Sequence, residues 1–148
     1  MPSSTIEDYL KAVYTEEHNN RDHLAKTVKC AEKLKVTPGT ATIMIKNMEK
    51  NGYLTYYPRK GCCLTDKGKC VVLKLLRRHR IIELFLQKIL NFDWSEVHEE
   101  ADRMEHCFSE KVINRMDKLL GYPKTDPHGE IIPDITSIPE KGIEQLEG

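Results

Sequence analysis

Two hydrophobic periodicities follow one another in the first half of the chain, one typical of helices and one typical of strands. STIEDYLKAVYTEEH opens with a capping-box pattern from Ser4 to Glu7, which predicts the start of a helix. A second helix is predicted from about Asp22 to Leu34, where apolar residues recur at helical spacing. The apolar face of the first helix is formed by Ile6, Leu10, Val13 and Tyr14.

A third helix is predicted in KVTPGTATIMIKNMEKNG. Thr37 suits the N-cap, Pro38 suits the first helical position, and Gly52 suits the left-handed position after the helix. About three residues separate this helix from the second one, a spacing that indicates a helix-turn-helix. The buried side is expected to contain Ala41, Met44, Ile45 and Met48.

After Gly52 the pattern changes to alternating β-prone residues in YLTYYPRKGCCLT. The turn residues in its middle predict a two-stranded hairpin with a basic tip at Arg59 and Lys60. A basic hairpin directly after a helix-turn-helix is interpreted as a wing that contacts phosphates or the minor groove. The alternative is a simple turn with solvated charges.

The face of the third helix opposite its apolar side has small, hydroxyl-bearing and basic residues, which fit a helix that enters the major groove. Ile43 is apolar on that face, where it could touch thymine methyl groups, and the alternative is a partly buried core residue. The predicted DNA-contacting residues are Thr37, Gly39, Thr40, Thr42, Ile43, Lys46, Lys50, Arg59 and Lys60.

A long helix is predicted from Thr65 to about Leu90. The stretch VVLKLLRRHRIIELFLQKIL is apolar on so many sides that part of it is expected to pack on another subunit. Phe92 to Ser95 interrupt it, with Asp93 or Ser95 as candidate caps for the next helix.

That next helix is the densest concentration of metal-capable side chains, in HEEADRMEH. At about 100° per residue, its candidate ligands fall within an arc of about 100°. On the preceding helix His79 and Glu83 are four residues apart and share a face. Imidazoles and carboxylates at these spacings are typical of divalent-cation sites on helices, and the alternative is a solvated acidic face. The candidates on the later helix are His98, Asp102, Glu105 and His106.

Charge divides the chain although its formal net charge is zero. Residues 21–80 contain 15 lysines and arginines against 4 aspartates and glutamates, a net of +11, and the remainder has a net of −11. This asymmetry indicates a basic module that meets a polyanion and an acidic module with another role. The five cysteines show no CxxC spacing, so reduced thiols and a cytoplasmic location are expected. The apolar runs are too short to span a bilayer, so no membrane partner is expected.

Catalytic motifs are missing from the sequence. HEEAD resembles the start of an HExxH zinc-protease motif, but Asp102 stands where the second histidine would be. There is no GxSxG, P-loop or GxGxxG. An enzyme is therefore not expected. Two alternatives to a metal-dependent regulator stay open: a metal-independent winged-helix transcription regulator, and a small metal-dependent hydrolase.

The chain resembles the diphtheria toxin repressor family of metal-dependent transcription regulators, and in particular its short manganese-responsive members. The resemblance rests on EDYLKAVY, AEKLKVTPGTATIMIKNMEKNGYL, LTDKG, RRHRIIELFL, HEEADRMEHCFS and GYPKTDPHGEIIP. It implies a mainly α fold, with an N-terminal winged helix-turn-helix that has a small β-hairpin wing, followed by an all-helical dimerisation and metal-binding domain. The expected limits are 1–72 and 73–140, with a tail at 141–148.

The resemblance also implies two metal sites. Asp102, Glu105 and His106, with Asp8 from the first helix, resemble the family's primary site. His79, Glu83 and His98 resemble its ancillary site. Asp8 and Asp102 stand where the iron-responsive branch has sulfur ligands, which favours Mn²⁺ and leaves Zn²⁺ or Fe²⁺ as alternatives.

Two further departures from the family affect these sites. Lys11 stands where the manganese branch has a glutamate, and the third, SH3-like domain of longer relatives is not expected in this chain. The implied function is a repressor that binds double-stranded operator DNA as a metal-activated homodimer and controls metal-uptake genes.

Overall fold

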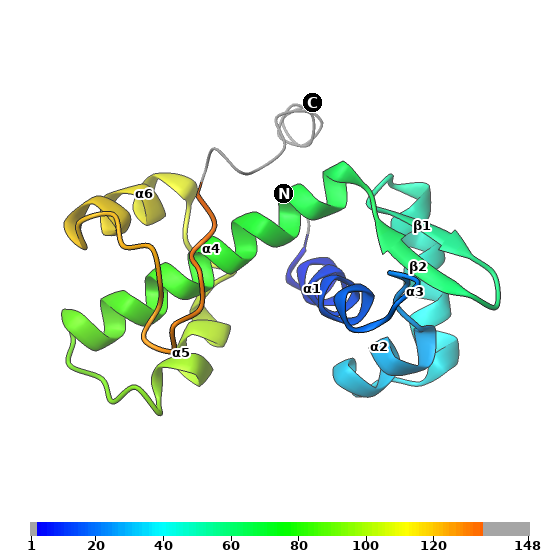
Figure 1. Cartoon of the computed structure of the whole chain (residues 1–148), viewed down its shortest axis with the longest axis horizontal. Coiled ribbons are helices and arrows are strands. Elements are labelled where there is room, and N and C mark those ends of the chain that lie inside the picture. The colour runs from blue at the N-terminus through cyan, green and yellow to red at the C-terminus, as the bar shows by residue number, and fades with distance from the viewer. Residues whose placement is uncertain (1–2, 135–148) are drawn as a thin grey trace. The chain divides into compact units, whose positions relative to one another are not determined.

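The computed structural model describes residues 3–134. Within that range the chain divides into two compact units, of which the first ends at Val72 and the second begins at Leu73. The first unit holds three helices and a hairpin, and the second holds two helices beside the distal part of a long one (Figure 1). The predicted tail 141–148, and the last residues of the predicted second domain, lie outside the described residues.

Helix α1, Ser4–Asn19, begins one residue earlier than the predicted cap requires. Ser3 is the N-cap, and its side chain accepts a hydrogen bond from the Ile6 amide at 3.3 Å. The capping box placed at Ser4 was therefore wrong by one residue. Leu10 and Val13 are fully buried, as their spacing predicted.

Helix α2 spans Thr27–Leu34 and starts five residues after the predicted position at Asp22. The reason lies in a local turn and a distant partner. The Asp22 carboxylate accepts from the Leu24 amide at 3.1 Å, and Ala25 pairs with Cys62 in an isolated antiparallel bridge. Residues 22–26 are thus held in a turn and an extended segment, which no helical spacing could reveal.

Helix α3 spans Pro38–Lys50, and the signals at both of its ends are confirmed. The Thr37 hydroxyl accepts from the Thr40 amide at 3.1 Å, and Gly52 has φ +84°. Lys35, in the left-handed region, ends α2 and opens the short turn between the two helices. Ala41, Ile45 and Met48 are fully buried, whereas Met44 is half-buried.

The predicted hairpin is confirmed. Strand β1, Leu54–Tyr57, pairs antiparallel with β2, Gly61–Leu64, and Leu54 lies opposite Leu64. Leu54, Cys62 and Leu64 point into the unit, while the tip between the strands is exposed. Together with α2 and α3, the hairpin gives the first unit the winged helix-turn-helix arrangement that the sequence predicted.

Helix α4, Asp66–Lys88, is the long helix expected from Thr65 to Leu90. Its distal half packs on α5, Val97–Met104, and α6, Glu110–Leu119. The core of the second unit includes Ile81, Ile82, Leu84, Leu86, Val97, Ala101, Ile113 and Met116. Much of the apolar surface that was expected to meet another subunit is therefore buried inside its own unit, although Ile89 and Leu90 stay exposed.

Three local features of the second unit differ from the expectation. Helix α6 was not predicted, although Ser109 caps it and Ile113 and Met116 are spaced for burial. Neither Asp93 nor Ser95 caps α5, because the N-cap is Glu96 and its side chain makes no capping bond. Among residues 3–134, none of the helices has the length and apolarity that crossing a bilayer requires.

Candidate metal centre and nucleic-acid interface

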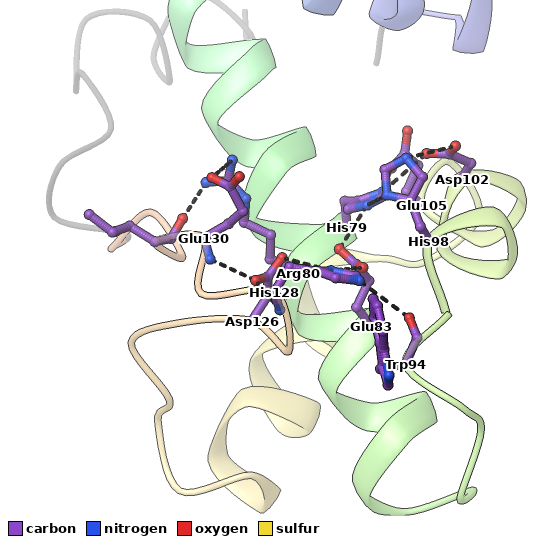
Figure 2. Close-up of polar contacts among 11 residues, drawn as sticks. His79, Arg80, Glu83, Trp94, His98, Asp102, Glu105, Asp126, His128 and Glu130 are labelled. Carbon is purple, nitrogen blue, oxygen red and sulfur yellow. Dashed lines mark hydrogen bonds and ion pairs between the residues drawn. The ribbon is translucent and has the colours of Figure 1, made fainter. Parts of the chain in front are cut away.

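His79 is the hub of a cluster of imidazoles and carboxylates in the second unit (Figure 2). It lies on α4, and its side chain is nearly fully buried. Its Nε2 atom is 2.9 Å from Glu83 Oε1 and 3.2 Å from His98 Nδ1. Its Nδ1 atom is 2.5 Å from Glu105 Oε2 and 3.3 Å from Asp102 Oδ1. Both ring nitrogens therefore face potential metal ligands.

The two ligand sets expected from the resemblance meet at this imidazole. His79, Glu83 and His98 come together as expected for one set. Asp102 and Glu105, which were expected in the other set, also converge on His79. In the structure, His79 therefore contacts ligands that were expected to belong to two separate metal sites.

Glu105 and His106 lie just beyond α5 and not on it. The helix ends at Met104, and Glu105 is its C-cap residue with an α-helical backbone. His106 follows in a turn, with its Nε2 atom 3.7 Å from Glu105 Oε1. The expectation of four ligands on one continuous helix was wrong, because the last two occupy the turn that closes it.

A second group of ligand atoms was missed by the sequence analysis. His128 Nδ1 is 3.1 Å from Glu83 Oε2 and 3.9 Å from Asp126 Oδ2. Glu83 thus turns one oxygen to His79 and the other to His128, as Figure 2 shows. The only sequence signal was an acid and a histidine on either side of Pro127, 43 and 45 residues after Glu83.

The loop that carries His128 is built from local hydrogen bonds. Asp126 is buried, and its Oδ1 atom accepts from the amides of His128 at 2.9 Å and Glu130 at 2.8 Å. His128 Nε2 is 3.2 Å from the carbonyl oxygen of Trp94, and the two rings meet edge to face. Arg80 of α4 holds the far side of the loop through the carbonyl oxygen of Ile131.

The electrostatics of Glu83 suit a cation. Burial by itself would raise the pKa of this carboxyl, but the hydrogen bond from His79 and the nearby His128 and His98 outweigh burial and lower it. Its Oε2 atom is buried and has no hydrogen-bond partner among the described residues, although His128 is close. An ionised, buried carboxylate oxygen without such a partner is what a coordinated divalent cation would satisfy.

The predicted DNA-contacting residues lie mainly on the surface of the first unit. Thr37, Gly39, Thr40, Lys46 and Lys50 are exposed along α3. Thr42 is half-buried, and its hydroxyl donates to the Pro38 carbonyl at 2.9 Å.

The apolar and wing residues of this surface are also exposed. Ile43 is 70% exposed, so the interpretation as a partly buried core residue was wrong. Arg59 and Lys60 lie at the exposed tip of the hairpin, and Arg59 has φ +67°. The exposed face of α3 and the hairpin tip thus both present basic side chains, and Ile43 is an exposed apolar residue on α3.

These two units define a class of protein: a winged helix-turn-helix chain whose second, helical unit has a His/carboxylate cluster. Residues 1–62 match the family described as iron dependent repressor, N-terminal DNA binding domain, and residues 65–134 match its metal binding and dimerisation domain. The chain therefore belongs to the iron-dependent repressor family, whose members are metal-dependent transcription regulators and not enzymes.

Individual relatives agree with this assignment. The iron-dependent repressor IdeR of Mycobacterium tuberculosis is 34% identical over 143 residues, which cover 95% of this chain and 61% of the relative. An uncharacterised helix-turn-helix regulator of Methanocaldococcus jannaschii is 36% identical over 115 residues, 77% of this chain and 90% of that protein.

Solved structures show the same likeness. A manganese-dependent transcriptional repressor in complex with manganese is 36% identical, with a TM-score of 0.79 over 88% of this chain and 59% of its own. The repressor ScaR with bound Cd²⁺ is 38% identical, with a TM-score of 0.77 over 90% of this chain and 60% of its own. This chain therefore spans about three fifths of the length of these relatives.

Proposed function

We propose that this protein is a divalent-metal-activated transcriptional repressor that binds double-stranded operator DNA as a homodimer. The observation that carries the proposal is the combination, in one chain, of an exposed recognition surface on α3 and a buried cluster centred on His79. We place the protein in the cytoplasm, where its DNA is, and propose metal-uptake genes as its targets. In this proposal metal binding favours the DNA-bound state of the repressor, so uptake is repressed when metal is sufficient.

Mn²⁺ is proposed as the physiological metal, with Zn²⁺ or Fe²⁺ as alternatives. The cluster offers carboxylate oxygens and imidazole nitrogens, and no cysteine lies in its ligand groups among the described residues. Such ligands suit harder ions. Solved structures of relatives hold manganese, cadmium or zinc, so the choice among these ions rests on the chemistry of the ligands.

We propose two metal sites. Asp102, Glu105 and His106 would hold the activating ion, and Asp8 of α1 stays a proposed ligand on the strength of the resemblance. Glu83 would anchor the second ion, with His79 and His98 on one side or Asp126 and His128 on the other. A divalent cation would place positive charge beside Glu83, Glu105 and Asp126, whose carboxylates are buried.

Both sites can be coupled to repression by mass action. An ion that binds the DNA-competent state better shifts the chain toward it, and at 100 times Kd it contributes about 2.7 kcal/mol per site. Allosteric couplings are typically about 1–3 kcal/mol, so a single site of this kind is sufficient.

The test is a metal-dependent gel shift on duplexes selected from a random pool. Wild-type protein should bind when Mn²⁺ is added and release DNA when the metal is chelated. Glu105→Gln should abolish the metal response while leaving the helical content intact, because Glu105 is buried at the centre of the cluster. Glu99→Gln removes an exposed carboxylate from α5, the helix that Glu105 caps, and serves as the matched control.

Two results would contradict the proposal. Equal DNA affinity with and without metal would favour a metal-independent regulator. An unchanged metal response in Glu105→Gln would mean that the cluster around His79 is not the activating site. The second ion is assigned by comparing His98→Ala with His128→Ala, since only the side that binds it should lower the number of ions held per chain.

A further inference from the structure

The edge of β2 that faces away from β1 is covered at Cys62 and Leu64, and a further contact falls on Lys60, the tip residue just before β2. Lys60 receives a hydrogen bond on its carbonyl oxygen from Lys26 Nζ at 2.9 Å. Cys62 exchanges two backbone bonds with Ala25, at 2.7 Å and 2.9 Å. Cys62 and Leu64 are alternate residues of β2 and direct their backbone groups to the same edge, and the Lys60 carbonyl extends this seam of contacts into the tip.

The third contact of this seam comes from a buried acid. Leu64 donates its amide to Glu17 Oε2 at 2.9 Å, and Glu17 is only 6% exposed. Gly61 allows the seam to close, because a Cβ atom there would collide with the carbonyl oxygen of Ala25. The base of the hairpin is thus held by buried contacts and does not depend on exposed charged side chains.

The tip of the wing is fixed differently. At the tip, before Gly61, the seam continues through Lys26, whose ammonium group is shared between the Lys60 carbonyl and Asp22 Oδ2, each at 2.9 Å. Asp22 is itself anchored, since its other oxygen accepts from the Leu24 amide at 3.1 Å. An ionised acceptor orients the flexible lysine, and the lysine then holds the carbonyl at the end of the tip.

We infer that Lys26, oriented by Asp22, is a positioning residue that sets the wing tip for its contact with DNA. This inference rests on the DNA-binding function proposed above. Arg59 and Lys60 supply the positive charge at the tip, and Lys26 determines where that charge is presented. Without Asp22 or Lys26 the tip would still connect β1 and β2, but its position relative to the rest of the unit would no longer be fixed.

The substitution Asp22→Asn should change DNA affinity in opposite directions, depending on whether Asp22 acts through its charge alone or by positioning the wing. Asp22→Asn removes a negative charge from a DNA-binding unit, so electrostatics alone predicts tighter binding. If Asp22 positions the wing through Lys26, the same change should weaken binding by about five- to twentyfold in a dimer with two wings. Glu32→Gln, an exposed change of equal charge on α2, is the control and should leave affinity unchanged or raise it.

A double-substitution cycle separates positioning from a direct phosphate contact by Lys26. Lys26→Met should weaken binding in wild-type protein but have little effect when Arg59 and Lys60 are already alanine, because the charges it positions are gone. Additive losses would show that Lys26 acts on DNA independently and would overturn the inference. Equal or tighter binding by Asp22→Asn would overturn it as well.

A measurement without DNA keeps the inference distinct from the proposed function. Amide hydrogen exchange at Lys60 and Gly61 should quicken at least about fivefold in Asp22→Asn, while the Cys30 amide in α2 keeps its protection. Unchanged exchange at the tip would refute the positioning role even if no duplex is bound. Failure of wild-type protein to bind any duplex with metal would refute the proposed function alone.

Discussion

At the scale of single residues, Ile43 and His79 show how little a side chain's type reveals before its surroundings are known. Ile43 is apolar yet 70% exposed in the middle of a basic surface, and His79 is polar yet only 4% exposed. Each departs from the usual burial of its residue type. Both departures fit the proposed function, in which Ile43 contacts DNA and His79 lies at a metal site.

Ile43 is expected to read a thymine methyl group. Replacing the contacted thymine by deoxyuridine removes one methyl group, worth about 0.8 kcal/mol or about fourfold in affinity. Wild-type protein should show this loss at one position of each half-site, and Ile43→Ala should not. Val28→Ala, another exposed apolar residue of the same unit, should keep the wild-type sensitivity. Persistent sensitivity in Ile43→Ala would assign the contact to another residue.

The buried thiols of the first unit predict a loss of stability at alkaline pH. Burial, and then the nearby Glu16, raises the pKa of Cys30 to about 11, and burial, followed by Cys30, raises the pKa of Cys62 to about 12. The folded state therefore keeps these protons while thiols of the unfolded chain lose theirs from about pH 8.5. Raising the pH through this window should lower the free energy of unfolding.

Denaturant unfolding between about pH 8 and about pH 10.5 checks this expectation. In Cys62→Ala the free energy of unfolding should fall less steeply with pH than in the wild type. Cys107→Ser, at an exposed thiol, should keep the wild-type dependence on pH. Equal slopes in all three proteins would show that the thiols do not carry the effect.

At the scale of elements, Gly61 and Gly39 offer a matched pair on the wing and on α3. Gly61 has φ +134° and lies against the Ala25 carbonyl, while nothing lies within 4 Å of a Cβ atom at Gly39. Gly61→Ala should destabilise the first unit by about 2–4 kcal/mol, and Gly39→Ala should stabilise it by up to about 1 kcal/mol. Thermal unfolding of both variants tests this contrast, and similar Tm values would contradict it.

Elements set by neighbouring residues could be predicted, and those set by distant partners could not. The cap at Thr37, Pro38 and the left-handed Gly52 define α3 within its own sequence. The start of α2 at Thr27 depends instead on Ala25 pairing with Cys62, 37 residues away. The link from His128 to Glu83 likewise spans 45 residues, so local spacing predicted His79 with Glu83 but missed Asp126 and His128.

At the scale of the whole molecule, two units with different tasks share one continuous helix, α4. The first unit holds the proposed recognition surface, and the second holds the cluster of candidate ligands around His79. The charge division follows these tasks only in part, since residues 21–80 carry the net positive charge but Lys74, Arg77, Arg78 and Arg80 belong to the second unit. Metal binding and DNA binding should therefore respond differently to salt.

Metal is expected to stabilise the second unit directly. Mn²⁺ at about 100 times Kd should contribute about 2.7 kcal/mol per site, which raises Tm by about 5–10 °C for a chain of this size. Differential scanning calorimetry checks the shift, and a chelator should reverse it. His79→Ala should reduce the shift, whereas His18→Ala, on α1 outside the cluster, should retain it. A metal-induced shift of the same size in His79→Ala would contradict the central place given to that imidazole.

DNA affinity is expected to fall steeply with salt, because the proposed recognition surface includes Lys46, Lys50, Arg59 and Lys60. Lys46→Ala should reduce the slope of log affinity against log salt by about one per protomer and weaken binding to all sequences alike. Filter binding at several salt concentrations measures the slope. A slope equal to that of the wild type would mean that Lys46 does not meet a phosphate.

The covered edge of β2 should protect the protein against aggregation through its hairpin. Two-stranded hairpins present free backbone groups on both sides, and such rims can recruit strands from other chains into fibrous aggregates. Here Ala25 and Glu17 occupy one rim, and Glu49 accepts the Tyr56 amide at 2.6 Å on the other. The wing can therefore project toward a polyanion without offering its own backbone as a template for fibril growth.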